Sequence, residues 1–209
     1  KDYKKVIQRY PQSPLREDAT YNIAWCLMES VAIEEGGEQA VGVVEAFKTY
    51  LDQYPKGRHV ETAHYTLAEI SFNQGELERA YELFSQVLEK FPASVAAEEA
   101  QRVLPQLREA LSFQEYTLVM KVFERAKEEE SVALFRDAIR QFEEVWKQYP
   151  ETQGGIGSMV NVGVCYQRLK EWERAVEAFD VVINEGEKGN PQVTPNVLGF
   201  VERRRGTIA

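Results

Sequence analysis

The chain has 209 residues, of which 44% are hydrophobic and 28% charged, and its net charge at pH 7 is −9. The apolar fraction is high enough to bury a core and excludes wholesale disorder, while the acidic balance argues against a nucleic-acid partner, which rewards a basic surface. Two cysteines cannot build a disulfide framework, and the sequence has no run of about 18 apolar residues that could span a membrane.

A short motif recurs along the chain and predicts the carboxyl ends of amphipathic helices. Its apolar and aromatic residues repeat at spacings of three, four and seven, which places them on one helical stripe and makes them expected core residues. Proline follows in every copy but the last, and it stops the helix because it lacks the N–H group. The copies are Tyr3-x-x-Val6-Ile7-x-x-Tyr10-Pro11, Phe47-x-x-Tyr50-Leu51-x-x-Tyr54-Pro55, Phe84-x-x-Val87-Leu88-x-x-Phe91-Pro92, Phe142-x-x-Val145-Trp146-x-x-Tyr149-Pro150 and Phe179-x-x-Val182-Ile183.

The motifs divide the chain into predicted helix pairs. The stretch between Pro92 and Pro150 is a long spacer between two copies of the motif. In it we expect one helix from Ser94 to about Leu111, where Pro105 can introduce a kink, and a separate helix from Phe113 to Glu130. Because the chain opens at Lys1 rather than Met, we expect a fragment or a processed form. In chain order the predicted units are the end of a preceding pair at 1–14, pairs at 17–57 and 61–94, an interposed long helix at 95–118, pairs at 119–152 and 156–189, and the start of a further helix at 191–209.

Small residues predict where the two helices of each pair touch, because small side chains let helix backbones approach closely. They are Ala24, Ala68, Ala126 and Gly163 in the first helices and Val43, Ala80, Ala138 and Ala175 in the second. Turns between the helices are predicted at Gly36-Gly37, Gln74-Gly75-Glu76 and Leu169-Lys170-Glu171, with a weaker signal near Ser131-Val132-Ala133.

These residues resemble the tetratricopeptide repeat, a helix–turn–helix unit of 34 residues. Segment 61–94 matches the pattern with Ala68, Gly75, Ala80, Phe84 and Pro92 in register. Segment 156–189 also matches, 17–57 fits with seven residues inserted around 31–37, and 119–152 is a poorer copy. The resemblance implies an all-α fold, an α-α superhelix or solenoid of antiparallel helix pairs, that binds protein or peptide on its concave face.

A narrower resemblance rests on Tyr10-Pro11-Gln12-Ser13-Pro14, on the recurring Tyr-Pro helix ends and on the long spacer before Pro150. These features are similar to the BamD-type outer-membrane assembly lipoproteins of bacteria, and the Tyr-Pro-x-Ser ending is also similar to periplasmic proteins of the Tol–Pal system. In the BamD-type family the helix after the long spacer carries a glutamate, which corresponds here to Glu115. The resemblance implies a periplasmic or outer-membrane-associated scaffold within a larger complex.

Residues that could carry catalysis or bind a metal are few. His59 and His64 are five residues apart, a spacing that does not suit a zinc pair on one helical face. Cys26 and Cys165 occupy equivalent positions in different pairs and are predicted to be buried, unpaired thiols. Gly154-Gly155-Ile156-Gly157 lacks the Lys-Ser/Thr end of a phosphate loop and predicts a flexible loop between pairs. We therefore expect no catalytic residue, no cofactor and no metal.

The first helix of each pair is expected to line the concave face. Several of its predicted residues are apolar or aromatic, as anchors for a peptide are; the open alternative is that half of them pack against a neighbouring helix. The candidate partner-binding residues are Tyr21, Trp25, Met28, Glu29, Tyr65, Glu69, Phe72, Asn73, Gln167 and Arg168, with Val160 and Val164 at equivalent positions.

Two functional hypotheses follow from the sequence. The first is a non-catalytic scaffold that binds a protein partner during assembly of a bacterial outer-membrane or envelope complex. The alternative is a cytosolic adaptor or regulatory domain of a larger multidomain protein, since repeat arrays of this kind serve many partners.

Overall fold

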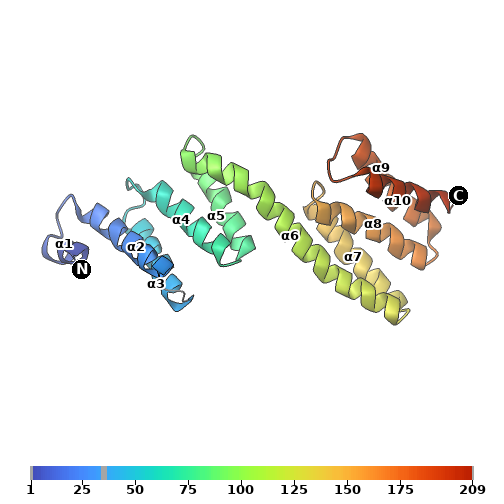
Figure 1. The fold of residues 1–209 in the computed structure, drawn as a ribbon, viewed down its shortest axis with the longest axis horizontal. Coiled ribbons are helices and arrows are strands. Elements are labelled where there is room, and N and C mark those ends of the chain that lie inside the picture. Colours follow the sequence, from blue (N-terminus) through green and yellow to red (C-terminus); the bar gives the residue numbers. More distant parts are fainter. Residues whose placement is uncertain (1, 34–36, 209) are drawn as a thin grey trace. The chain divides into compact units, whose positions relative to one another are not determined.

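The computed structural model describes residues 2–33 and 37–208, and within these ranges the chain forms ten α-helices and no strand (Figure 1). The predicted all-α fold of antiparallel helix pairs is confirmed. The turn expected at Gly36 lies outside the described residues, and Gly37 is the first residue of α3. The helices are α1 (Asp2–Arg9), α2 (Arg16–Ile33), α3 (Gly37–Gln53), α4 (Val60–Asn73), α5 (Leu77–Lys90), α6 (Val95–Glu128), α7 (Val132–Gln148), α8 (Gln153–Arg168), α9 (Trp172–Glu187) and α10 (Pro195–Gly206).

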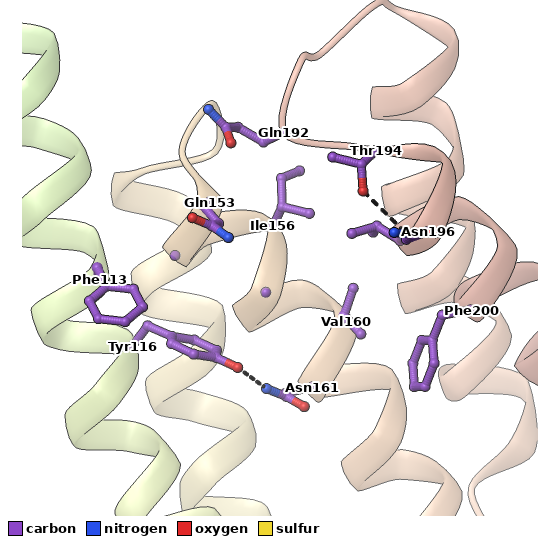
Figure 2. Close-up of a pocket in the computed structure, with 13 residues that line it drawn as sticks. Phe113, Tyr116, Gln153, Ile156, Val160, Asn161, Gln192, Thr194, Asn196 and Phe200 are labelled. Atoms are coloured by element: carbon purple, nitrogen blue, oxygen red, sulfur yellow. Dashed lines mark hydrogen bonds between the residues drawn. The ribbon is translucent and has the colours of Figure 1, made fainter.

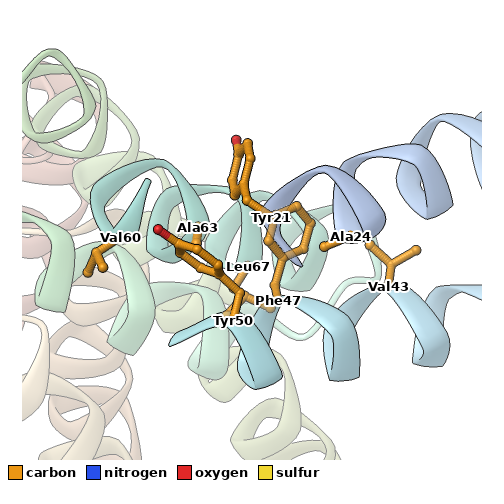
Figure 3. Close-up of a cluster of buried hydrophobic side chains, with 8 residues drawn as sticks. All are labelled: Tyr21, Ala24, Val43, Phe47, Tyr50, Val60, Ala63 and Leu67. Carbon is orange, nitrogen blue, oxygen red and sulfur yellow. The ribbon is translucent and has the colours of Figure 1, made fainter. Parts of the chain in front are cut away.

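The chain divides into two compact units, Lys1–Leu107 and Arg108–Ala209, each with its own core. In the first unit, one cluster of buried side chains lies between α2, α3 and α4 (Figure 3). A second cluster joins α4 and α5 to the first part of α6, through residues such as Phe84 and Leu107. In the second unit the ring of Phe123 on α6 meets Phe135 and Phe142 on α7 edge to face.

The small residues and the first aromatic of four motif copies are buried as the repeat pattern predicts. Phe47, Phe84, Phe142 and Phe179 occupy equivalent positions, and each is at most 1% exposed. A Cβ atom at Gly163 would lie 2.4 Å from Cε1 of Phe179, so glycine is what allows α8 to approach α9 this closely. The buried contact residues are Ala24, Val43, Ala68, Ala80, Ala126, Ala138, Gly163 and Ala175.

The turns inside three helix pairs share one conformation. Gly75, Glu130 and Lys170 all have positive φ, at 75°, 49° and 61°. In each turn the next residue donates its N–H to the carbonyl five residues back, as Glu171 does to Tyr166 over 2.9 Å. This is the Schellman ending of a helix, which usually places glycine at the left-handed position.

The break predicted between two helices in the central region is wrong, because one helix, α6, spans it. It runs without interruption from Val95 to Glu128, so the separate helices expected on either side of Ser112 are one. Ser112 is buried and its hydroxyl donates to the carbonyl of Glu109, which lets it stay inside the helix. Pro105 is tolerated because both it and Gln101, whose carbonyl loses its usual partner, are exposed to water.

Three predictions of burial are wrong. Tyr3 and Tyr10, expected in the core, are 41% and 63% exposed. Cys26 is exposed, whereas Cys165 at the equivalent position is buried. The same repeat position therefore has different surroundings on α2 and on α8.

Candidate protein-binding surfaces

The candidate residues on α2 divide between the core and the surface. Tyr21 is 9% exposed and belongs to the core cluster, with its ring stacked 4.2 Å from the ring of His59. Trp25 and Met28 are half-buried and pack against that cluster, while Glu29 is exposed and accepts the indole N–H of Trp25 over 3.2 Å. The indole N–H of Trp25 is therefore already paired, and a partner could contact only the accessible part of the ring.

The candidates on α4 are more accessible. Tyr65 is half-buried, with its ring edge against Phe84. Glu69 is exposed, and desolvation nevertheless raises the pKa of its carboxyl group above the ordinary value. Phe72 is 44% exposed and Asn73 is also exposed, so these two present the freest surface among the predicted residues of the first unit.

The two histidines do not form a common site. His59, in the loop before α4, lies 3.0 Å from a carboxylate oxygen of Asp18 through its Nε2 atom. His64 is half-buried against the ring of Phe91, and desolvation lowers the pKa of its imidazole. His59 therefore links this loop to α2, and His64 packs against the residue that caps the end of α5.

The candidate Gln167 on α8 is occupied by α10. Its carbonyl oxygen accepts from the guanidinium of Arg204 over 2.8 Å, and its amide donates to the backbone carbonyl of the same residue. Arg168 is exposed, whereas Val164 is buried. Helix α10 thus covers the end of the α8 face that the sequence assigned to a partner.

The opposite end of that face opens into a pocket within the second unit. It has a volume of about 410 Å³ and lies between α6, α8 and α10, with the loop that precedes α10 at its edge (Figure 2). Aromatic rings stand on two sides, Phe113 and Tyr116 from α6 and Phe200 from α10. The lining residues are Phe113, Tyr116, Gln153, Gly154, Ile156, Gly157, Val160, Asn161, Gln192, Thr194, Asn196, Val197 and Phe200.

Glycines at the start of α8 make the pocket. They form the first turns of a helix, so the flexible loop predicted for 154–157 is wrong. A Cβ atom at Gly154 would lie 2.5 Å from the backbone oxygen of Ser112, and one at Gly157 would lie 3.2 Å from the ring of Tyr116. The missing side chains let α8 lie directly against α6.

The loop before α10 is held in place by its own polar contacts. The side-chain amide of Asn190 donates to the carbonyl of Pro150 over 3.3 Å, and its oxygen accepts the N–H of Gln192. Thr194 then caps α10 by accepting the N–H of Val197. These contacts set Gln192 and Thr194 at the edge of the pocket.

The polar chemistry of the pocket centres on one hydrogen bond between α6 and α8. The amide of Asn161 donates to the hydroxyl of Tyr116 over 3.0 Å and to the sulfur of Met120 over 3.3 Å. Burial raises the pKa of Tyr116 above its ordinary value, so its hydroxyl stays neutral. No lining residue is acidic, basic or histidine.

Sequence reasoning identified only part of this pocket. Val160 was expected on the inner face, but Asn161 beside it was not, and no residue of α6 was proposed. Phe113 and Tyr116 both lie on the helix predicted from Phe113 to Glu130, and their spacing of three places them on one face of that helix. Gln192 and Thr194 come from the loop before α10 and Phe200 comes from α10 itself, whose packing the sequence does not predict.

Comparisons with known proteins give a family match. A family model described as YfiO, outer membrane lipoprotein, matches residues 1–178, which include the α6 and α8 walls of the pocket but not α10. No curated protein matches the sequence significantly. Among solved structures the chain is similar to MamA, residues 41 to the end, from Desulfovibrio magneticus RS-1, at 12% sequence identity and a TM-score of 0.30, with 92% of each chain covered.

Proposed function

Because this chain belongs to the YfiO family of outer membrane lipoproteins, we propose that it is a scaffold for assembly of a bacterial outer-membrane or envelope complex. In this proposal it binds a protein partner on the inner face of its helix pairs. The pocket between α6, α8 and α10 is the observation that carries the proposal. It combines aromatic walls with a few polar groups, which is the composition of a surface that anchors a partner's side chains.

Two further features support a binding site at this pocket. Phe113 is 56% exposed at its edge, and a large apolar side chain that remains accessible beside a concave site is a typical anchor for a partner. The glycine contacts of α8 and the capped loop before α10 give the pocket fixed walls, which lowers the entropy cost of binding.

The proposed place of action is the periplasm or the inner surface of the outer membrane. None of the helices in the ranges 2–33 and 37–208 is both long and apolar enough to cross a membrane. The support for an envelope location comes from the family description.

Site-specific crosslinking in the parent organism tests this proposal. A photoreactive phenylalanine analogue replaces Phe113 in the full-length protein, and a second variant carries it at Glu144, an exposed position on α7 away from the pocket. We expect a crosslink to an envelope protein from position 113 alone, and recovery of the full-length protein with the membrane fraction. Recovery only from the cytosol, or no protein crosslinked from position 113, contradicts the proposal.

A further inference from the structure

Resting on the proposed function, we infer that the pocket between α6, α8 and α10 receives an uncharged, extended segment of the partner. The segment places an apolar side chain between the aromatic walls. Side-chain amides of the pocket hydrogen bond to its backbone. The inference adds to the scaffold proposal by stating the chemistry of the bound segment.

The first evidence is the absence of charge from the lining. Although 28% of the chain is charged, the 13 lining residues include no acidic or basic side chain. A charged side chain that entered would lose its water shell without gaining a counter-ion, and such unpaired burial is strongly unfavourable. The pocket therefore selects against Asp, Glu, Lys and Arg at the bound position.

The second evidence is a set of unused hydrogen-bonding groups. Four side-chain amides line the pocket, and within the described part of the chain those of Gln153, Gln192 and Asn196 have no hydrogen-bond partner. Asn161 uses its NH₂ group on Tyr116 and Met120, which leaves its carbonyl oxygen available in the same ranges. An amide side chain both donates and accepts, which matches the N–H and C=O of a peptide unit.

The same groups favour an extended segment over a helical one. A helix satisfies its backbone hydrogen bonds internally and offers a groove only its side chains. An extended segment has backbone N–H and C=O groups that need partners once water is removed. The side-chain amides of Gln153, Gln192 and Asn196 line the pocket and can supply them.

The apolar walls define where a side chain of the segment lies. Phe113 and Tyr116 face Val160 and Phe200 across the opening, and Ile156 lies between them (Figure 2). A volume of about 410 Å³ falls in the range of small-molecule sites, so it suits a short stretch of chain rather than a whole helix.

A peptide library tests the inference on the 209-residue chain. The probe is a library of nonapeptides randomised at every position, acetylated and amidated so that the ends carry no charge, with bound sequences read by mass spectrometry. We expect enriched peptides to lack Asp, Glu, Lys and Arg at their central positions. Methylation of the central backbone nitrogens of an enriched peptide is expected to weaken its binding about tenfold.

Matched variants place the binding in this pocket. The double variant Gln192→Ala and Asn196→Ala removes two side-chain amides that make no hydrogen bond within the described ranges, and it is expected to lose the enrichment. Gln114→Ala removes an exposed amide from α6 outside the pocket and is expected to keep it.

Several outcomes overturn the inference. They are enriched peptides with charged central residues, equal binding of the methylated peptide, unchanged enrichment in the double variant, or no enrichment at all. If any of these occurs while position 113 still crosslinks to an envelope protein, the chemistry of the segment is wrong and the scaffold proposal stands. Absence of that crosslink is the failure of the scaffold proposal itself.

Discussion

The hydroxyl of Tyr50, at the end of α3, donates to a carboxylate oxygen of Glu17, at the start of α2, over 3.0 Å. The same hydroxyl accepts the backbone N–H of His59, and the same carboxylate oxygen accepts the N–H of Arg58. The side chains of Tyr50 and Glu17 thus accept the backbone N–H groups of the two residues that lead into α4. The contact binds one helix pair to the next through the loop between them.

Replacing Tyr50 with phenylalanine is expected to lower the free energy of unfolding by about 1–3 kcal/mol. The change removes both hydrogen bonds of a fully buried hydroxyl and leaves the N–H of His59 without its acceptor. Urea denaturation followed by circular dichroism measures the effect. The control is Tyr54→Phe, whose half-buried hydroxyl makes no hydrogen bond within the described ranges and whose loss should cost less than about 0.5 kcal/mol. Equal costs for the two variants would contradict a structural function for the Tyr50 contact.

The stability difference between the original chain and Tyr50→Phe is expected to shrink at alkaline pH. Burial, the largest cause, together with the charge of Glu17, raises the pKa of Tyr50 from 10.0 to about 12 in the folded chain. A raised folded pKa gives stability that is fully present below pH 10 and is lost as the pH rises toward 12. Denaturation at pH 8, 10 and 11 should show the difference falling by up to roughly 1.4 kcal/mol per unit above pH 10. A difference independent of pH would show that Tyr50 ionises normally.

Substitution of Gly155 by alanine is expected to destabilise the second unit by about 1–3 kcal/mol or more. An added Cβ atom would lie 1.8 Å from the backbone oxygen of Tyr149, which belongs to the chain entering α8 and cannot simply rotate away. Gly199→Ala on α10 is the control, because its added Cβ would meet only the flexible end of Arg203 at 3.4 Å. Alanine there should stabilise the helix by up to about 1 kcal/mol. Thermal unfolding compares the two, and a harmless Gly155→Ala would show that α8 does not need this close approach.

The two cysteines are expected to react with a disulfide reagent at very different rates. Cys26 is exposed, whereas burial raises the pKa of the Cys165 thiol from 9.0 to about 12 and keeps it neutral. This raised pKa stabilises the fold below pH 9, and the contribution is lost as the pH rises toward 12. At pH 8 one thiol should therefore react in the native protein and two after unfolding in urea. Cys26→Ala should abolish the fast reaction, and two equally fast native thiols would contradict the burial of Cys165.

The sequence predicts most of the helix pairs because their contacts are local. Phe84 and Ala80 lie on one stripe of one helix, and their small partner Ala68 belongs to the helix just before it. The period therefore places these side chains in a core without knowledge of distant neighbours. The same reasoning holds for Phe179 and Gly163 in the second unit.

The failures concern residues whose environment depends on a different element. Cys26 and Cys165 share a repeat position, yet one is exposed and the other buried. The pocket depends on how α6 packs against α8 and on how α10 packs against it, which brings Phe113 and Phe200 to its two sides. Neither follows from the pattern within one repeat.

The left-handed turns have an evolutionary consequence. Gly75, Glu130 and Lys170 occupy corresponding turns, but only the first is glycine. A side chain at such a φ costs roughly 1 kcal/mol, yet the turns at Glu130 and Lys170 keep the same hydrogen bond to the carbonyl five residues back as the turn at Gly75. Repeats can therefore lose the turn glycine that helps to identify them in a sequence while the helix pair keeps its fold. In a chain of this kind, the sequence similarity between repeats is lost sooner than their shared structure.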